Sequence, residues 1–338
     1  MSVKPLKIQG NMFETNVEDL VRADHPYRKI LELLDFNKLC GGLVEECYSR
    51  YGKAGYHPVQ GVKMLFIQYW QDLSDRQLEE YLRDSNAGKY FCGFSLLEET
   101  PDFSYFSKFR TRIGTKRIAD IFNKIRVGLK ASGYMKEIFT FVDSSKIEAK
   151  VDTWRARDKA IVDSSNDEKD DDGNPTMNNK NVLEYSSDPY ARYGAKGKRD
   201  IWLGYKRHVS VDMGSGFINK VAVTQANVHD GVGLKHVCPK EGAVVADKAY
   251  SGGKADKELK KRGLHSMAIE PNNKKTKNRD KDRFISGLRM PFEGIFSKKS
   301  KKARFVGKVK TQLQCFMEAI VLNTKRALVL EIQKIPIS

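Results

Sequence analysis

Apolar residues recur with a helical period through the first 135 residues of the chain. In the stretch HPVQGVKMLFIQYWQDL they return every three or four positions, and this pattern predicts a helix that begins near Pro58. Ser74, with Gln77 three residues later, forms a capping-box motif and predicts the start of the next helix. The buried face of that second helix is predicted to consist of Leu78, Tyr81 and Leu82.

A third predicted helix, in FSYFSKFRTRIG, combines an aromatic stripe with basic side chains. Phe103, Phe106 and Phe109 recur at a spacing of three, which leaves the basic residues on other faces of the helix. Two helices joined by a tight turn and followed by a basic helix are the layout of a helix-turn-helix DNA reader. The alternative is a plain helical bundle in which the aromatic stripe is only core. On the DNA-binding hypothesis, the contact residues are Lys108, Arg110 and Arg112.

From Lys136 onward, the period and composition change to those of strands. Short runs of β-branched and aromatic residues are separated by turn formers, and two of them form a hairpin joined at residues 213–216. The later runs alternate with amphipathic stretches, which favours a mixed sheet covered by helices, an α/β architecture. The predicted strands cover residues 137–143, 201–212, 217–226, 242–247 and 265–271, and the predicted helices cover 229–238 and 251–263.

Two polar stretches in this second half are predicted to be loops. Residues 163–174 are acidic and rich in turn formers, so a mobile acidic loop is expected near 163–180. A calcium-binding loop is not favoured there, because the first and last ligand positions hold the wrong residue types. Residues 272–283 are predicted to be a charged linker. The expected organisation is an all-α domain over 1–135 and an α/β domain over 136–338.

The charge of the chain points to a polyanionic partner. It carries 60 Lys and Arg against 43 Asp and Glu, a formal net charge of +17. The excess is concentrated in residues 271–310, which contain fourteen basic and three acidic residues. Basic side chains that neutralise a nucleic-acid backbone release its counterions, which favours binding. A solvated basic face is the alternative, but apolar residues such as Phe284, Leu288 and Phe292 interleave this tract.

Three acidic residues are candidate metal ligands. Asp143 and Asp247 follow runs that predict buried strands, and Glu293 lies in a predicted helix. Oxygen ligands from several elements suit a pair of Mg²⁺ ions about 3.5 to 4 Å apart. Because a basic tract surrounds Glu293, a nucleic-acid phosphodiester is the favoured substrate of such a site.

Other features narrow the class of protein. The chain contains no run of eighteen apolar residues and no apolar leader, so a soluble cytoplasmic protein is expected. Its five cysteines are an odd number without a Cys-x-x-Cys pair, and they are expected to be reduced and mostly buried rather than bound to zinc. His208, His229 and His236 are expected to be structural residues rather than general bases.

Several motifs in order carry a resemblance over nearly the whole chain. The stretches GYHPVQGVKMLFIQYWQDLSDRQLEEYLRDS and PDFSYFSKFRTRIG are followed by VDSSKIEA, DPYARYGAKGK, WLGYKRHVSVDMGSG, VTQANVHDG, ADKAYSG and RMPFEGIF. The sequence resembles the DDE transposases of bacterial insertion sequences, of the group called insertion-sequence family five. The resemblance implies a ribonuclease-H-like catalytic domain preceded by a helix-turn-helix-like domain that binds DNA ends.

The resemblance also implies roles for individual residues. Asp143, Asp247 and Glu293 would be the catalytic acids and the ligands of two Mg²⁺ ions, which Mn²⁺ could replace. Arg289 would contact DNA phosphate, with a salt bridge to a nearby acid as its competing role. Further phosphate contacts would come from Lys298, Lys299, Lys301 and Lys302.

The last motif departs from the family signature. Ser286 and Ser300 stand where the signature has Tyr and Lys. Pro291 precedes Glu293 by two residues, and proline is tolerated mainly in the first turn of a helix. The helix therefore either starts close to Glu293 or is kinked at Pro291.

The implied activity is transposition. It comprises binding of terminal inverted repeats, metal-dependent cleavage at the transposon ends and transfer of the freed 3′-hydroxyl into target DNA, all carried out by a homodimer or larger synaptic complex associated with the nucleoid. Three alternatives stay open: a nuclease without strand transfer, an inactive element that only binds DNA, and an RNA-binding protein.

Overall fold

The chain forms two compact units. The first comprises Met1–Tyr134 with Phe316–Ser338, and the second comprises Met135–Cys315. The sequence analysis counted residues 316–338 with the second domain, whereas by their contacts they group with the first unit. The computed structural model describes residues 16–47, 55–151, 186–196, 200–270, 277–297 and 300–337.

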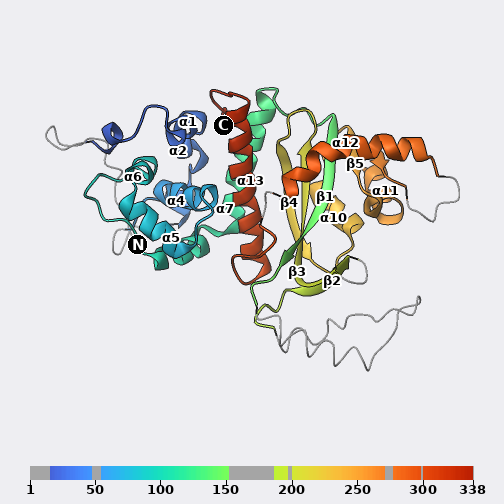
Figure 1. Cartoon of the computed structure of the whole chain (residues 1–338), viewed down its shortest axis with the longest axis horizontal. Coiled ribbons are helices and arrows are strands. Elements are labelled where there is room, and N and C mark those ends of the chain that lie inside the picture. Colours follow the sequence, from blue (N-terminus) through green and yellow to red (C-terminus); the bar gives the residue numbers. More distant parts are fainter. Residues whose placement is uncertain are drawn as a thin grey trace. The chain divides into compact units, whose positions relative to one another are not determined.

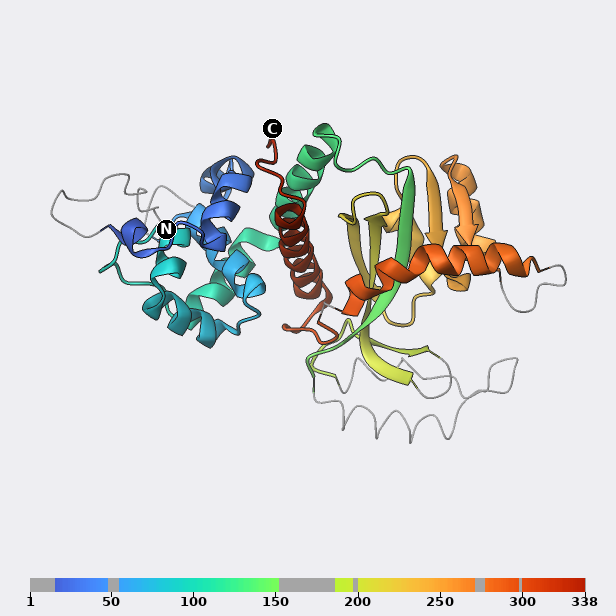
Figure 2. The same ribbon diagram turned by 45° about the horizontal axis from the view of Figure 1, so that its top comes forward.

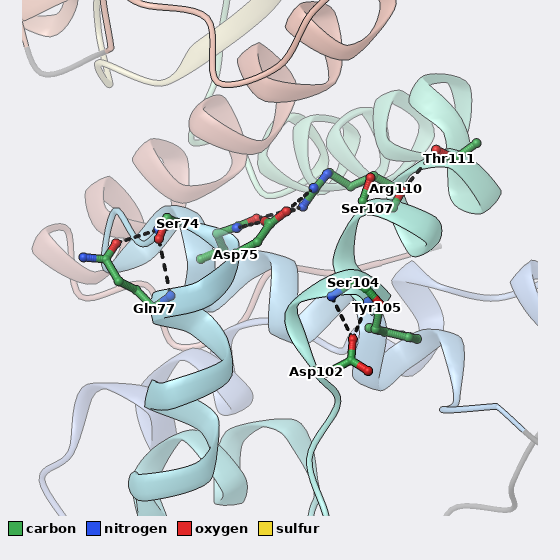
Figure 3. A network of polar contacts seen from close by, with 10 residues as sticks. Ser74, Asp75, Gln77, Asp102, Ser104, Tyr105, Ser107, Arg110 and Thr111 are labelled. Carbon is green, nitrogen blue, oxygen red and sulfur yellow. Dashed lines mark hydrogen bonds and ion pairs between the residues drawn. The ribbon is translucent and has the colours of Figure 1, made fainter.

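The first unit is helical, as predicted (Figure 1). Helix α4 (Pro58–Trp70) begins at the predicted proline, and almost all of its side chains are buried. Helix α5 (Asp75–Asp84) follows the predicted capping box, in which Ser74 N donates to Gln77 Oε1 at 2.9 Å (Figure 3). In return, Gln77 N donates to Ser74 Oγ at 3.3 Å, so both unpaired backbone donors are satisfied.

Helix α6 is among the helices of this unit that were not predicted individually. It comprises Asn86–Cys92 and lies between α5 and α7 (Phe103–Ala131). It has only seven residues, too few for a helical period to be visible, and it is bounded by the Ser85 cap and by Gly93 with φ of 77°. The remaining elements are η1 (Val17–Leu20), α1 (Pro26–Leu33), α2 (Phe36–Leu39) and α3 (Leu43–Cys47).

The end of the chain completes the core of the helical unit. The division between the units falls within α13 (Lys308–Val329). From Phe316 onward this segment packs on the first unit, where the rings of Phe316 and Phe122 lie 5.7 Å apart. Farther on, Ile335 N donates to the carbonyl of Leu33 at 3.0 Å.

The second unit has an α/β fold in which the described strands form one mixed sheet. The strand order is β4-β3-β1-β5-β6, and β2 pairs with the first part of β3. Strands β1, β3 and β4 pair antiparallel, whereas β5 is parallel to β1 and β6 is parallel to β5. This is the strand order of the ribonuclease-H-like fold, so the predicted fold class is confirmed. The strands are β1 (Phe139–Glu148), β2 (Arg192–Lys196), β3 (Asp200–Asp212), β4 (Ile218–Gln225), β5 (Ala243–Ala246) and β6 (His265–Ala268).

Helices cover both faces of this sheet. Helices α10 (Asp230–Val237) and α11 (Gly253–Lys261) share one core with alternate residues of β1 and β5, including Val142 and Val244. Helix α12 (Arg279–Ser297) packs against the same two strands from the other side, as Figures 1 and 2 show. The predicted hairpin of β3 and β4 and the predicted helices α10 and α11 are confirmed.

Of the two predictions for the polar stretches, one needs correction and the other concerns residues outside the described ranges. Residues 279–283 were predicted to belong to a linker, but they form the first turn of α12, which Asn278 caps by accepting from Lys281 N at 3.0 Å. The helix therefore starts well before Pro291, which lies inside it. Of the two alternatives considered, a start close to Glu293 is excluded. The predicted acidic loop at 163–180 lies outside the described residues.

Two global expectations can be compared with the structure. The five cysteines are free thiols, and all except Cys47 are buried, as predicted. No helix in the described part of the chain combines the length and the apolar character needed to cross a membrane.

Candidate active site

Asp143 lies on the face of β1 that α12 covers. Successive side chains of a strand point to opposite faces of the sheet. Phe141 packs against Phe292 of α12, with ring centroids 5.8 Å apart, whereas Val142 belongs to the core shared with α10 and α11. Since Asp143 follows Phe141 by two residues, its side chain points to the same face of β1, toward α12.

Asp247 reaches the same face from the neighbouring strand. Strands β1 and β5 pair in parallel up to Val142 and Ala246, and both of these residues lie in the α10–α11 core. The residues that follow these two, Asp143 and Asp247, therefore face α12. Adjacent strands lie about 4.8 Å apart, so the carboxylates of Asp143 and Asp247 are neighbours on this face of the sheet.

Glu293 is linked to this pair through Arg289. The two residues are one helical turn apart on α12, and Arg289 Nη2 lies 3.6 Å from Glu293 Oε1. Arg289 Nη1 lies 3.6 Å from Asp247 Oδ1, so one guanidinium contacts both acids. Because the guanidinium is a rigid fork, these contacts bring the carboxylates of Asp247 and Glu293 within about 10 Å of each other. The competing role considered for Arg289, a salt bridge to a nearby acid, is the arrangement in this structure.

The carboxyl of Asp143 is held in an environment that resists ionisation. Burial raises the pKa of Asp143 to about 6, although the Ser144 backbone N–H, which donates to Oδ1 at 2.7 Å, acts in the opposite direction. The positive charges of Arg289 and Lys196 also lower this pKa, and the neighbouring Asp247 raises it. A buried carboxylate next to a second carboxylate is stabilised by a bound cation.

A cavity of about 730 Å³ opens beside the two aspartates. Four acidic and five basic side chains line it, and Tyr250 and Trp202 contribute aromatic walls. Glu293 is not among the lining residues, and its side chain is 58% exposed. The charged lining residues are Asp143, Asp200, Asp230, Asp247, Lys146, Lys196, Lys206, Lys248 and Lys301.

The donor set of this region fits a hard divalent cation. Two carboxylates are adjacent, and oxygen ligands are what Mg²⁺ and Mn²⁺ prefer. Within the described ranges, no three His, Cys, Asp or Glu side chains are gathered closely enough to hold a metal ion together. The structure thus brings Asp143 and Asp247 together, while Glu293 is engaged with Arg289 at the edge of the site.

The predicted basic residues near Glu293 are partly described. Lys301 lines the cavity, and the backbone around it is fixed because its carbonyl accepts from Glu148 N at 2.8 Å. Lys302 is exposed and forms a parallel bridge with Glu148 at the end of β1. Lys298 and Lys299 lie outside the described residues.

Of the three basic residues predicted on α7, Arg110 is placed differently from the prediction. Lys108 is exposed and Arg112 is half-buried, but Arg110 is only 6% exposed. Its two terminal nitrogens donate to the carboxylate of Asp75 at 2.9 and 2.6 Å, joining α7 to α5 (Figure 3). Because Arg110 is buried and its guanidinium is bound to Asp75 in this bidentate way, we do not retain it as a DNA contact.

The three histidines have structural surroundings. His229 caps α10 by accepting from Gly231 N at 3.1 Å. His208 is fully buried, and its Nε2 lies 2.8 Å from Thr224 Oγ1. His236 lies in the last turn of α10. The sequence analysis named Lys301 but missed Lys146, Lys196, Lys206 and Lys248, because no local pattern shows that these lysines line one cavity.

Comparison with known protein families assigns the chain. A model described as "Transposase DDE domain" matches residues 154–328, and a model described as "Transposase domain (DUF772)" matches residues 15–112. The chain belongs to the transposase DDE domain family. The assignment to the group called insertion-sequence family five stays a prediction.

Solved structures of other transposases show a remote likeness to this transposase. A piggyBac transposase synaptic complex with hairpin DNA is 8% identical, with 90% of this chain and 74% of that chain covered and a TM-score of 0.36. A Mos1 transposase paired-end complex with left transposon end is 9% identical, with 86% and 83% covered and a TM-score of 0.18. The family assignment rests on the sequence models alone. It identifies the protein as a DNA transposase, an enzyme that cuts and joins DNA with the help of divalent metal ions.

Proposed function

We propose that Asp143, Asp247 and Glu293 are the metal-binding acids of this transposase, and that two Mg²⁺ ions, or Mn²⁺ in their place, are bound there. The observation that carries the proposal is the placement of Asp143 and Asp247 directly after Val142 and Ala246, the last paired positions of two neighbouring parallel strands, on the face that α12 covers. The contact of Arg289 with both Asp247 and Glu293 supports the inclusion of the third acid.

The side chains of the site have different roles in the proposed reaction. When bound, Mg²⁺ supplies Lewis-acid stabilisation of the charge that develops on the attacking and leaving oxygens of the phosphodiester. Asp143 and Asp247 provide the anionic oxygens that hold the cation, and Asp143 must lose its proton to do so. Arg289 holds the carboxylates of Asp247 and Glu293 in place in the absence of metal. When these carboxylates bind the metal instead, the planar guanidinium of Arg289 would be available to a phosphate group.

The DNA substrate is proposed to be the terminal inverted repeats of an insertion sequence. Cleavage would release a 3′-hydroxyl, which would then attack target DNA in a second transesterification at the same site. The basic charge of the chain supports binding to the DNA backbone and association with the nucleoid. Two ends must be cut together, so a homodimer or larger synaptic complex is the proposed working form.

The test uses duplex oligonucleotides that carry the inverted repeats found in the DNA flanking the coding region. With Mg²⁺ or Mn²⁺, the wild-type protein is expected to give both cleaved ends and products joined to target DNA. Asp143→Asn and Glu293→Gln are expected to lower both yields by at least about a hundredfold, because each removes a ligand of the charge-stabilising cation. Cleavage without joined product would identify a nuclease instead.

A measurement of metal binding separates this assignment from a folding defect. Mn²⁺ should raise the thermal unfolding midpoint of the wild-type protein but not of Asp143→Asn, since only ligands that bind the folded state stabilise it. Asp256→Asn, on α11 and outside the cavity, is the matched control and should respond to Mn²⁺ like the wild type. An equal response of Asp143→Asn and the wild type would refute the proposed ligand set.

A further inference from the structure

Two lysines of the cavity stand directly opposite each other in the sheet. Lys146 of β1 is the register partner of Lys206 of β3, and both side chains line the cavity beside Asp143. Directly opposed residues of an antiparallel pair have Cβ atoms about 5 Å apart, and like charges at such positions destabilise the pairing. The stability of the sheet therefore does not explain why both positions are basic.

Each ammonium group is held by an aspartate of the same cavity. Lys146 Nζ lies 2.6 Å from Asp200 Oδ1, and Lys206 Nζ lies 3.1 Å from Asp230 Oδ1. Lys206 Nζ also donates to the carbonyl of Val228 at 3.0 Å. The two lysine side chains are 31% and 15% exposed, so the groups are oriented by their surroundings but open to the cavity.

The position of this lysine pair suits a strand of DNA that passes through the metal site. The pairing of β1 with β5 ends at Val142, and from Asp143 onward the cavity extends along the free edge of β1. Lys146 follows Asp143 by three residues, about 10 Å along the strand, and this odd spacing places the two side chains on opposite faces of β1. Both nevertheless line the same cavity, which lies where β1 has no neighbour on the β5 side. A DNA strand that follows this cavity past Asp143 and Asp247 would bring a neighbouring phosphate to the two ammonium groups.

We infer that Lys146 and Lys206 bind a DNA phosphate next to the one that is cut. When DNA is absent, the Lys146 ammonium forms an ion pair with Asp200 instead. The inference rests on the proposed function, because it takes the cavity as the path of the cleaved strand. Two ammonium groups at directly opposed positions can donate to the two non-bridging oxygens of one phosphodiester. The carboxylate of Asp200, 43% exposed, is the group that an incoming phosphate can displace.

The first experiment measures binding of the full-length protein to a 30-base-pair duplex of arbitrary sequence at several salt concentrations. Lys146→Gln and Lys206→Gln should each reduce the slope of log affinity against log salt by about 0.9, because each removes one phosphate contact. Lys261→Gln, at an exposed position of α11 outside the cavity, is the control and should leave the slope within about 0.3 of the wild type. Slopes of both cavity variants equal to that of the control would overturn the inference.

A second variant guards against an indirect effect on the fold. Removal of Lys206 alone leaves Asp230, which is half-buried, without its ion-pair partner. The double variant Lys206→Gln with Asp230→Asn removes both charges, and it should show the same loss of slope as Lys206→Gln. Recovery of the wild-type slope in the double variant would mean that the uncompensated aspartate, not the missing phosphate contact, caused the loss.

Removal of the Asp200 charge should have the opposite effect on DNA binding, a gain in affinity. Asp200→Asn should increase the affinity for the same duplex by about two- to fivefold, because the Lys146 ammonium loses the nearer of its two carboxylate partners, the other being Glu148 at 3.9 Å. Asp256→Asn makes the same change of charge on α11 and should give less than half of that gain. An equal gain in both variants would refute the role of Asp200.

The metal response keeps the two proposals apart. The lysine variants should retain the Mn²⁺-dependent rise of the unfolding midpoint, which Asp143→Asn loses. If the slopes fall as expected while Asp143→Asn still responds to Mn²⁺, the phosphate site stands and the metal assignment fails. If Asp143→Asn behaves as proposed and the slopes do not fall, the metal assignment stands and the phosphate site is wrong.

Discussion

His208 is a fully buried titratable group near the site. Burial lowers its pKa to about 4, and the charges of Lys206 and His236 act in the same direction. The carboxylate of Asp230 raises this pKa, but it does not offset burial. The hydroxyl of Tyr250 lies 3.5 Å from Nδ1, and Gly233 of α10 leaves room for the imidazole ring where a Cβ would lie 2.3 Å from it. His208 is therefore neutral in the folded protein over the physiological range.

This depressed pKa predicts a loss of stability in mild acid. Between about pH 6.5 and 4 the unfolded chain binds a proton on His208 that the folded chain does not, so the free energy of unfolding falls as the pH is lowered. The slope approaches about 1.4 kcal/mol per pH unit, and it vanishes above the unfolded pKa. Asp143, whose folded pKa is raised, gives the opposite contribution below pH 6. Denaturant unfolding of His208→Gln should show a shallower acid loss than the wild type.

The control for His208→Gln is His265→Gln, at an exposed position of β6. It should retain the acid loss of the wild type. If His208→Gln were to lose stability toward acid as steeply as the wild type, the proton uptake would have to be assigned to another group.

Residue identities could be predicted where a local pattern sets the environment. Asp143 and Asp247 were found because each follows an apolar run that predicts a strand, although β1 continues beyond Asp143 to Glu148. The alternation of side chains then fixes which face they share. Arg110 was misassigned because its partner, Asp75, is distant in the sequence, and no local pattern shows that their side chains meet. The opposed lysines were missed for the same reason, since the register of β1 with β3 is a property of the folded sheet.

At the level of elements, α7 is two helices joined at one glycine. Gly114 has φ of 69° and ψ of 164°, a conformation that is not helical and that is accessible essentially to glycine only. The backbone turns there between the first part, which carries Arg110, and the second part, which carries Phe122. A Cβ at Gly114 would meet no atom within 4 Å, so the requirement for glycine comes from the backbone alone.

Gly114→Ala is therefore expected to destabilise the helical unit by about 1 to 3 kcal/mol, the cost of a strained backbone conformation. The loss should appear as a lower midpoint in urea with an unchanged slope. Gly287→Ala, an exposed glycine within α12, is the matched control because it should instead stabilise its helix by up to about 1 kcal/mol. A neutral result for Gly114→Ala would show that the two helical parts can join without this turn.

Which elements were predictable follows from their length and period. The strands β1, β3 and β4 and the helices α4, α5, α10 and α11 carry a period long enough to read. Strands β5 and β6 have only four residues each and were found as short runs between helical stretches. Strand β2 has five residues, and glycine and alanine at its centre give no β-branched signal, so it was missed. The start of α12 was placed too late because its first turn is charged, and only the Asn278 cap marks the boundary.

At the scale of the whole molecule, the two units have separate cores. Trp70 lies in the first unit, where the ammonium of Lys325 stands 4.8 Å from its ring, and Trp202 lines the cavity of the second unit. Each tryptophan can therefore report on its own unit. The third, Trp154, lies outside the described residues.

Separate cores predict two unfolding transitions rather than one. In variants that keep only Trp70 or only Trp202, with phenylalanine at the other two positions, fluorescence in urea should give different midpoints. Gly114→Ala should lower the Trp70 midpoint alone, since Gly114 lies in the first unit. Mn²⁺ at about a hundred times its dissociation constant should stabilise the Trp202 transition by about 2.7 kcal/mol for each ion bound, because the proposed ligands all lie in the second unit. If both probes instead shifted together under either change, α13, which spans the division, would have to couple the units into one cooperative structure.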